Sequence, residues 1–290
     1  MTRMFLFATL SIVATLCAVD VSADVSYVEE IVNSGIGAAK VGARKTVRRV
    51  YVKGQSQHLR DEIKSADATE VASTIVRLDR LNQYRIDHAS GTFTERKLPA
   101  RAPTPPAASK TTTSAAVVAP KAVAADPNRE VTFKTRALPD TMRVEGILCR
   151  RVAVQMRARY YVPGTKQVRR ENRYLYQAWV ATDFPGYDDI ERFEAQREEK
   201  TSLPSQISGG LSQFAAAVED YDSLDEEMKN LDGFPMQSQL KVFTTTATSS
   251  KEKELFRLSR KVSSPSNADL SPSLFEVSKG LRRVEVEAAP

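Results

Sequence analysis

Apolar and polar residues alternate with a period of two over most of the chain, which predicts a protein built mainly from β-strands. The alternating runs in the first hundred residues lie at 27–33, 45–54, 57–64 and 73–95. The strongest signal is RVAVQMRARYYV (151–162), where every second residue is apolar. A Pro163-Gly164 turn follows, and RRENRYLYQAWVA (169–181) alternates again. These segments predict antiparallel strands with one apolar face and one polar face.

The period then changes to about 3.6 residues. Residues 187–200 carry acids early and a lysine late, as the helix dipole favours, and residues 208–231 place an apolar side chain every third or fourth position. Strand patterns resume at 236–246 and 254–262. Since runs of strands enclose one helical block, the predicted fold class is α+β: a strongly curved antiparallel sheet with a helical lid on its concave face.

Residues 99–128 interrupt this pattern with Pro, Ala, Thr and Ser and no apolar periodicity. Such a segment buries too little apolar surface to offset the entropy of ordering it. Because the strand signals on both sides are alike, we interpret it as a disordered insertion in one β-rich domain, with halves at 24–98 and 129–290. The helical block at 187–231 belongs to the second half. A linker between two separate domains is the alternative.

The first 23 residues have the pattern of a secretory signal peptide. Arg3 gives a positive start, residues 4–19 are apolar, and VSA (21–23) predicts cleavage after the alanine. The apolar run is short for a membrane span, and no stop-transfer pattern follows. A lipoprotein anchor at Cys17 is disfavoured because Leu16 stands where that signal needs a small residue. We therefore expect an exported protein, periplasmic or extracellular.

Few residues in the chain could carry catalysis. Cleavage would leave Cys149 as the only cysteine, and His58 and His88 are the only histidines, so neither a disulfide nor a Cys/His zinc site can form. Cys149 with one histidine could make a nucleophile–base pair, but its strand pattern is typical of a small buried hydrophobe. No G-x-S-x-G or H-E-x-x-H motif occurs. We expect a non-enzymatic protein with no cofactor and no metal.

The formal net charge is +6, and residues 143–173 hold nine Lys/Arg against Glu145 and Glu171. A solvated sheet face or a blunted sheet edge explains this basic hairpin. Contact with an anionic membrane surface is the alternative. That contact would use Arg150, Arg151, Arg157, Arg159, Arg169 and Arg170. Nucleic acid is disfavoured, because an exported chain rarely meets it.

Four local patterns resemble one known family. They are TIVRLDRLNQYRIDHASGTFTE (74–95), GILCRRVAV (146–154), WVATDFPGYDDIERF (179–193), and LDGFPMQSQLKV (231–242) followed by SPSLFEVSKGLRRV (271–284). In this order they resemble a bacterial domain-of-unknown-function family grouped with the lipoprotein-localisation-factor (LolA/LppX-like) superfamily. The resemblance covers residues 25–98 and 130–284. The chain departs from the family at the 99–128 insertion and at Ser278, where the family usually has Pro.

The resemblance implies an incomplete β-barrel, LolA-like, with helices filling its open side. In characterised superfamily members the cavity takes acyl chains or lipid-linked cargo, and no catalytic residues come with the likeness. The predicted ligand is therefore a lipid or another apolar molecule. The predicted lining residues are Val152, Val154, Met156, Tyr160, Tyr174, Tyr176, Leu240 and Val242, with Phe214, Val218 and Tyr221 from the lid.

Two alternatives to this carrier hypothesis remain. The same apolar residues could form an ordinary packed core with no room for a ligand. The protein could then be an envelope scaffold or sensor that acts through protein–protein contacts of the basic hairpin or the 99–128 segment.

Overall fold

The computed structural model describes residues 24–36, 40, 42–101, 128–201, 221–229 and 231–285, and these form one twelve-stranded sheet. The strands are β1 (Val25–Asn33), β2 (Arg44–Lys53), β3 (Ser56–Lys64), β4 (Thr69–Arg77), β5 (Asn82–Asp87), β6 (Thr92–Lys97), β7 (Arg129–Val144), β8 (Ile147–Tyr161), β9 (Val168–Ala181), β10 (Phe234–Thr246), β11 (Ser249–Ser266) and β12 (Arg282–Arg283). The helices are α1 (Tyr187–Lys200), α2 (Tyr221–Lys229) and the 3₁₀ helix η2 (Pro272–Phe275).

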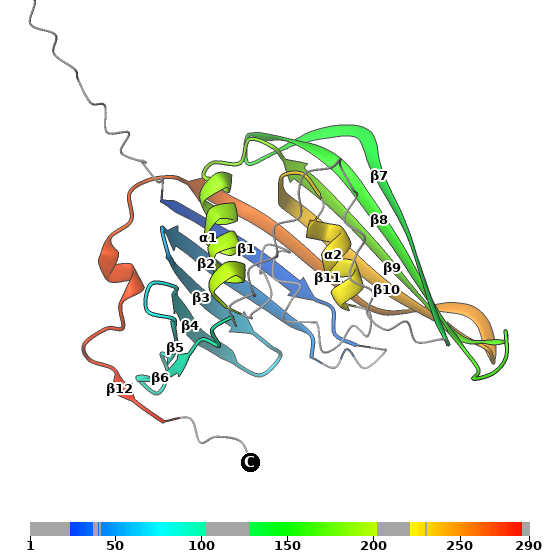
Figure 1. Ribbon diagram of the computed structural model, residues 1–290, viewed down its shortest axis with the longest axis horizontal. Coiled ribbons are helices and arrows are strands. Elements are labelled where there is room, and N and C mark those ends of the chain that lie inside the picture. The colour runs from blue at the N-terminus through cyan, green and yellow to red at the C-terminus, as the bar shows by residue number, and fades with distance from the viewer. Residues whose placement is uncertain are drawn as a thin grey trace, which may run out of the picture.

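Two antiparallel meanders, β1–β6 and β7–β11, meet in the middle of the sheet (Figure 1). The strand order is β12-β6-β5-β4-β3-β2-β1-β11-β10-β9-β8-β7, so β1 pairs with β2 on one side and with β11 on the other. The short β12 adds to β6 in parallel. The outermost strands are β12 and β7, and the sheet is therefore open rather than closed into a barrel.

Both α-helices lie on the same side of the sheet (Figure 1), and we call this side the inner face. Two hydrophobic clusters form the core there. The first cluster joins β8, β9, β10, β11 and one residue of β1 with α2, and the second joins β1–β4 and residues of β7–β11 with α1. Ile190 and Phe193 are the residues through which α1 enters the second cluster. The predicted alternation along 151–162 and 169–181 is confirmed, because buried and less buried residues alternate along β8 and β9.

Helix α1 has the predicted bounds, and its start is set by one glycine. Gly186 precedes the helix with φ +73°, a conformation that side chains with a Cβ rarely adopt. A Cβ at this position would also stand 2.1 Å from Cγ2 of Val25. Asp188 and Asp189 in the first turn and Arg197 in the last turn match the helix dipole. Gly186 therefore lets the chain leave β9 and turn closely over β1.

The prediction of an α+β fold with a helical lid is wrong, because most described residues lie in strands and only α1 and α2 are α-helices among them. Of the helix predicted over 208–231, the described residues contain only Tyr221–Lys229. Twelve strands spaced about 4.8 Å apart span about 55 Å, whereas α1 and α2 are only about 21 and 14 Å long. Two helices of this size cannot form a second layer over the sheet.

The signal peptide predicted over residues 1–23 lies outside the described residues, as do most of the 99–128 segment and the stretch 202–220. Within the ranges that the structure describes, no helix has both the length and the apolar character needed to span a bilayer.

Candidate functional site

The strand residues predicted to line an apolar cavity lie side by side on the inner face. The register places Val154 opposite Tyr176, and Tyr176 opposite Leu240. All eight belong to the first hydrophobic cluster, and none is more than 7% exposed. We call this set the inner apolar strip: Val152, Val154, Met156, Tyr160, Tyr174, Tyr176, Leu240 and Val242.

Helix α2 packs on part of the inner apolar strip. Its Leu224 and Met228 are buried in the same cluster. The hydroxyl of Thr135 on β7 donates a hydrogen bond to the carboxylate of Glu227, which ties the helix to the edge of the sheet. Of the three predicted lid residues, Tyr221 is the first residue of α2, and Phe214 and Val218 lie outside the described residues.

A row of buried and half-buried polar side chains lies between the two hydrophobic clusters. At its centre, Nη2 of Arg260 lies 2.6 Å from Oε1 of Glu29, with the two side chains only 2% and 4% exposed. Arg260 also donates to the carbonyl of Pro235. We call this row the polar belt; it comprises Asp61, Arg48, Glu29, Arg260 and Ser238, and Ser238 hydrogen-bonds with Tyr176 of the inner apolar strip.

The belt holds charge inside the core. Burial alone would lower the pKa of Arg260, but Glu29 and Tyr27 raise it above the ordinary value of arginine. Burial raises the pKa of Tyr27, and the negative charge of Glu29 raises it further. Beside this pair, Arg48 donates twice to Asp61, over 2.7 and 2.9 Å. Since each buried charge has a partner of opposite sign, the row is tolerated in the core.

The belt is absent from the sequence-based predictions, although one sign of it is visible in the printed sequence. Glu29 lies two residues from both Tyr27 and Ile31, so the strand pattern puts all three on the same face. Arg260 shares a face with Leu258 in the same way. A charged residue at an apolar-facing strand position needs a buried partner. The sequence gives no hint of which partner, because Glu29 and Arg260 are 231 residues apart.

A groove lies on the outer face of the central strands, opposite the inner apolar strip. Gln177 on β9 alternates with the buried Tyr176 and Ala178, so its side chain points away from the core. Trp179 is partly buried and also packs against the second hydrophobic cluster. The register places Trp179 opposite Gln237 on β10. Together with residues of β1, β8 and β11 they line a cavity of about 420 Å³, which we call the outer groove.

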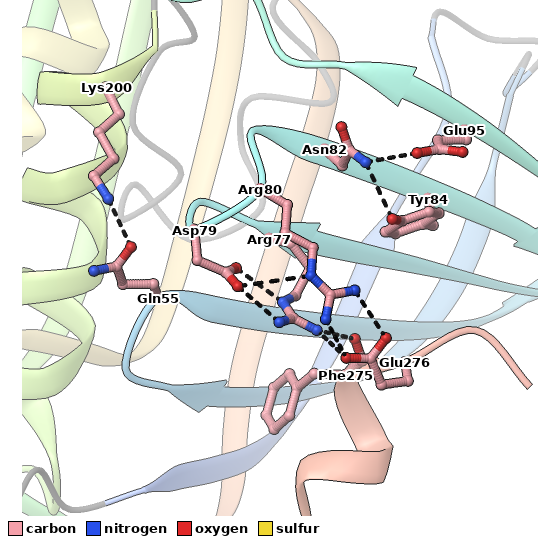
Figure 2. Close-up of polar contacts among 10 residues, drawn as sticks. All are labelled: Gln55, Arg77, Asp79, Arg80, Asn82, Tyr84, Glu95, Lys200, Phe275 and Glu276. Atoms are coloured by element: carbon pink, nitrogen blue, oxygen red, sulfur yellow. Dashed lines mark hydrogen bonds and ion pairs between the residues drawn. The ribbon is translucent and has the colours of Figure 1, made fainter.

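The C-terminal strap, residues 267–284, is clamped to the first meander. Helix η2 contacts β3 and β4, and its Phe275 is 3% exposed. Figure 2 shows the carboxylate of Glu276 between the guanidinium groups of Arg77 and Arg80; Arg80 donates to it over 3.1 and 3.2 Å. Asp79 binds the other side of the Arg77 guanidinium, at 2.8 and 2.9 Å. The strap is therefore held by ion pairs as well as by Phe275.

Acidification should loosen the strap. Burial tends to raise the pKa of Glu276, but the hydrogen bonds and positive charges of Arg77 and Arg80 together outweigh this and leave the pKa below the ordinary value. The pKa of a glutamate in the unfolded chain is about 4.3, and above this pH an ionised Glu276 stabilises the folded contact fully. The stabilisation is lost as the pH falls through the lower pKa that Glu276 has in the folded protein. We expect hydrogen-exchange protection of the Arg282 and Val284 amides, which bond to β6 and its preceding turn, to decrease in that range.

The matched variant is Glu276→Gln. It should show reduced protection of the same two amides already at neutral pH, and a smaller further loss on acidification. Equal protection of the wild-type protein and the variant at neutral pH would show that Glu276 does not hold the strap.

The structure does not bring Cys149 together with a histidine. Cys149 on β8 and His58 on β3 are six places apart in the strand order, and His88 follows β5. The thiol is buried, which raises its pKa, and its Sγ lies 3.5 Å from the carbonyl oxygen of Ile147. His88 contacts the hydroxyl of Ser73 at 2.9 Å. Among the described residues, no group of three or more His, Cys, Asp or Glu side chains is placed to hold a metal ion.

The arginines predicted to face an anionic membrane are largely paired with local acids. Four have carboxylate partners: Arg150 with Asp232, Arg151 with Asp140, and both Arg157 and Arg159 with Glu171. The guanidinium of Arg170 lies 4.3 Å from the ring centre of Tyr160, and the side chain of Arg169 is exposed. Local acids thus neutralise much of the charge of the hairpin, and its contact with a membrane stays a prediction.

No family model matches the chain, and no curated protein matches it. Among solved structures, PNGF-II in a P21 and in a C2 crystal form aligns with a TM-score of 0.30 in each case and with 9% and 10% sequence identity. The alignments cover 92% of this chain but only 32% and 31% of PNGF-II, so the chain spans about a third of that protein's length. Likeness this weak carries no argument about function, and the resemblance to the LolA/LppX-like superfamily stays a prediction.

Proposed function

We propose that the protein is a non-enzymatic carrier that binds the acyl chain of a lipid, or an apolar molecule of similar shape, against the inner apolar strip. The observation that carries this proposal is the continuity of the strip. Eight apolar or aromatic side chains from three adjacent strands form one surface without a charged group. Ligand sites for apolar molecules are lined in this way, with a few polar groups at one end.

The dimensions of the strip support an elongated ligand. From Val152 to Tyr160 the strip extends about 27 Å along β8, at about 3.4 Å per residue. Helix α2 packs on this strip through Leu224 and Met228. The polar belt meets the strip at Tyr176, opposite Val154 near one end of the strip, where a polar end group would meet charged and hydroxyl groups. An acyl chain with a polar head matches this order of apolar and polar surface.

The proposed compartment is the periplasm or the extracellular space, because of the apolar segment at residues 4–19. There a lipid in transit needs a protein that shields its acyl chain from water. Moving each CH₂ group out of water is favourable by about 0.8 kcal/mol of free energy.

The test is native mass spectrometry of the protein purified from an exported fraction without detergent, with organic extraction of the same sample. We expect one stoichiometric apolar adduct, and saturable binding of a fluorescent fatty-acid probe. Val154→Phe fills part of the strip and should weaken probe binding about tenfold, because overpacking by one ring costs about 1–3 kcal/mol.

Gln155→Phe is the matched control. It introduces the same ring at the next residue of β8, which points to the outer face. We expect it to bind the probe as the wild-type protein does. A clean mass without adduct, together with no binding of the probe, would exclude the carrier and favour the scaffold or sensor alternative.

A further inference from the structure

The outer groove has the side-chain composition of a ligand site, and it is separate from the inner apolar strip. Its central row runs across three strands in register, with Arg151 opposite Trp179, and Trp179 opposite Gln237. Gln177 and Gln239 form the next row. The volume of about 420 Å³ falls in the range of about 300–1,000 Å³ that small-molecule sites occupy.

Arg151 is held beside the indole ring by its neighbours. Its Nη1 donates to Oδ2 of Asp140 over 3.1 Å, and its Nη2 donates to Oε1 of Gln177 over 3.2 Å. The guanidinium carbon lies 5.9 Å from the ring centre of Trp179. The flat indole and the guanidinium donors are therefore positioned before any ligand arrives, which reduces the entropy cost of binding.

The charged groups of the groove are paired. Besides Arg151 with Asp140, Lys261 lies 3.8 Å from Glu145, and Glu30 lies 2.8 Å from Lys45. Arg260, which also lines the cavity, is paired with Glu29. The groove therefore presents little net charge to a ligand. A polyanion such as a nucleic acid needs an excess of unpaired Lys and Arg, and this groove does not supply one.

We propose that the outer groove binds a neutral oligosaccharide. Glutamine amides both donate and accept hydrogen bonds, as hydroxyl groups require, and Gln177 and Gln237 are exposed. The indole of Trp179 offers an apolar face for the C–H groups of a sugar ring. A peptide fits less well, because the groove lies on a sheet face, where the backbone groups are already paired and no strand can be added.

The single tryptophan of the chain makes the test direct, because intrinsic tryptophan fluorescence then reports on the groove alone. The full-length exported protein is titrated with cellohexaose, maltohexaose and chitohexaose, and with a heparin-derived hexasaccharide as the anionic comparison. We expect a saturable change in emission with at least one neutral hexasaccharide below about 1 mM. The signal should be unaffected by removal of any apolar adduct, since the two sites lie on opposite faces.

Two alanine variants complete the test. Gln237→Ala removes an exposed amide from the groove and should weaken binding about three- to tenfold, as expected for one lost hydrogen bond. Gln155→Ala removes an amide from the same face of the sheet, outside the groove, and should leave binding unchanged. The proposal is overturned if no neutral hexasaccharide changes the emission, if only the heparin fragment does, or if Gln237→Ala binds as tightly as the wild-type protein.

Discussion

Glu29→Gln should lower the free energy of unfolding by about 3–5 kcal/mol, because it leaves the guanidinium of Arg260 buried without a charged partner. Arg260 is 2% exposed, and its Nε and Nη2 both donate to Oε1 of Glu29, over 3.1 and 2.6 Å. Urea unfolding followed by circular dichroism measures the change.

The next residue of β1 provides the control. Glu30 pairs with Lys45 at 2.8 Å on the outer face, where the two side chains are 48% and 46% exposed. Glu30→Gln should therefore lower the free energy of unfolding by less than about 1 kcal/mol. The double variant Glu29→Leu, Arg260→Met should recover most of the loss, because well-packed apolar residues can replace a buried ion pair. A loss below about 1 kcal/mol for Glu29→Gln would show that the pair does not hold the two meanders together.

Phe234→Ala should lower the free energy of unfolding by about 3–5 kcal/mol, the usual cost of deleting a fully buried ring. Phe234 is 1% exposed and stacks on Phe184, with the ring centres 4.0 Å apart. The ring of Tyr27 meets it edge-on at 5.3 Å, and the guanidinium of Arg260 lies 5.2 Å from its centre. The variant thus removes the contact point of β1, β10 and the segment that leads into α1. Thermal and urea unfolding both report the loss.

Phe243→Ala is the matched substitution on the same strand. Phe243 is only partly buried on the outer face, where the guanidinium of Arg173 lies 4.9 Å from its ring centre. We expect this variant to lower the free energy of unfolding by about 1 kcal/mol or less. A similar decrease in the free energy of unfolding for the two variants would mean that the aromatic contacts of Phe234 stabilise the fold no more than those of a partly buried ring.

Some of the functional candidates could be placed from the sequence alone. The alternation in β8, β9 and β10 puts all eight strand residues of the inner apolar strip on one face, and the structure places them together in one cluster. The outer groove could not be predicted in this way. In the sequence, Gln177 and Trp179 have the pattern of ordinary residues on the less buried face of a strand. Only the pairing of β9 with its neighbours brings Arg151, Gln237 and Lys261 into the same cavity.

What the sequence determines by itself is local. It specifies the strand periodicity, the Pro163-Gly164 turn with its positive φ at Gly164, and the bounds of α1, because each depends on residues within a few positions of one another. The balance of helix and strand is not local, since a helical pattern over 208–231 does not reveal how small a share of the fold the helices form.

Only the tertiary structure decided the pairing of β1 with β11, the polar belt, the outer groove and the clamped strap. Each of these joins segments that are far apart along the chain: Glu29 meets Arg260 across 231 residues, and Arg77 meets Glu276 across 199. A local pattern shows which face of a strand is apolar, but the partner of that strand is chosen by the packing of the whole sheet.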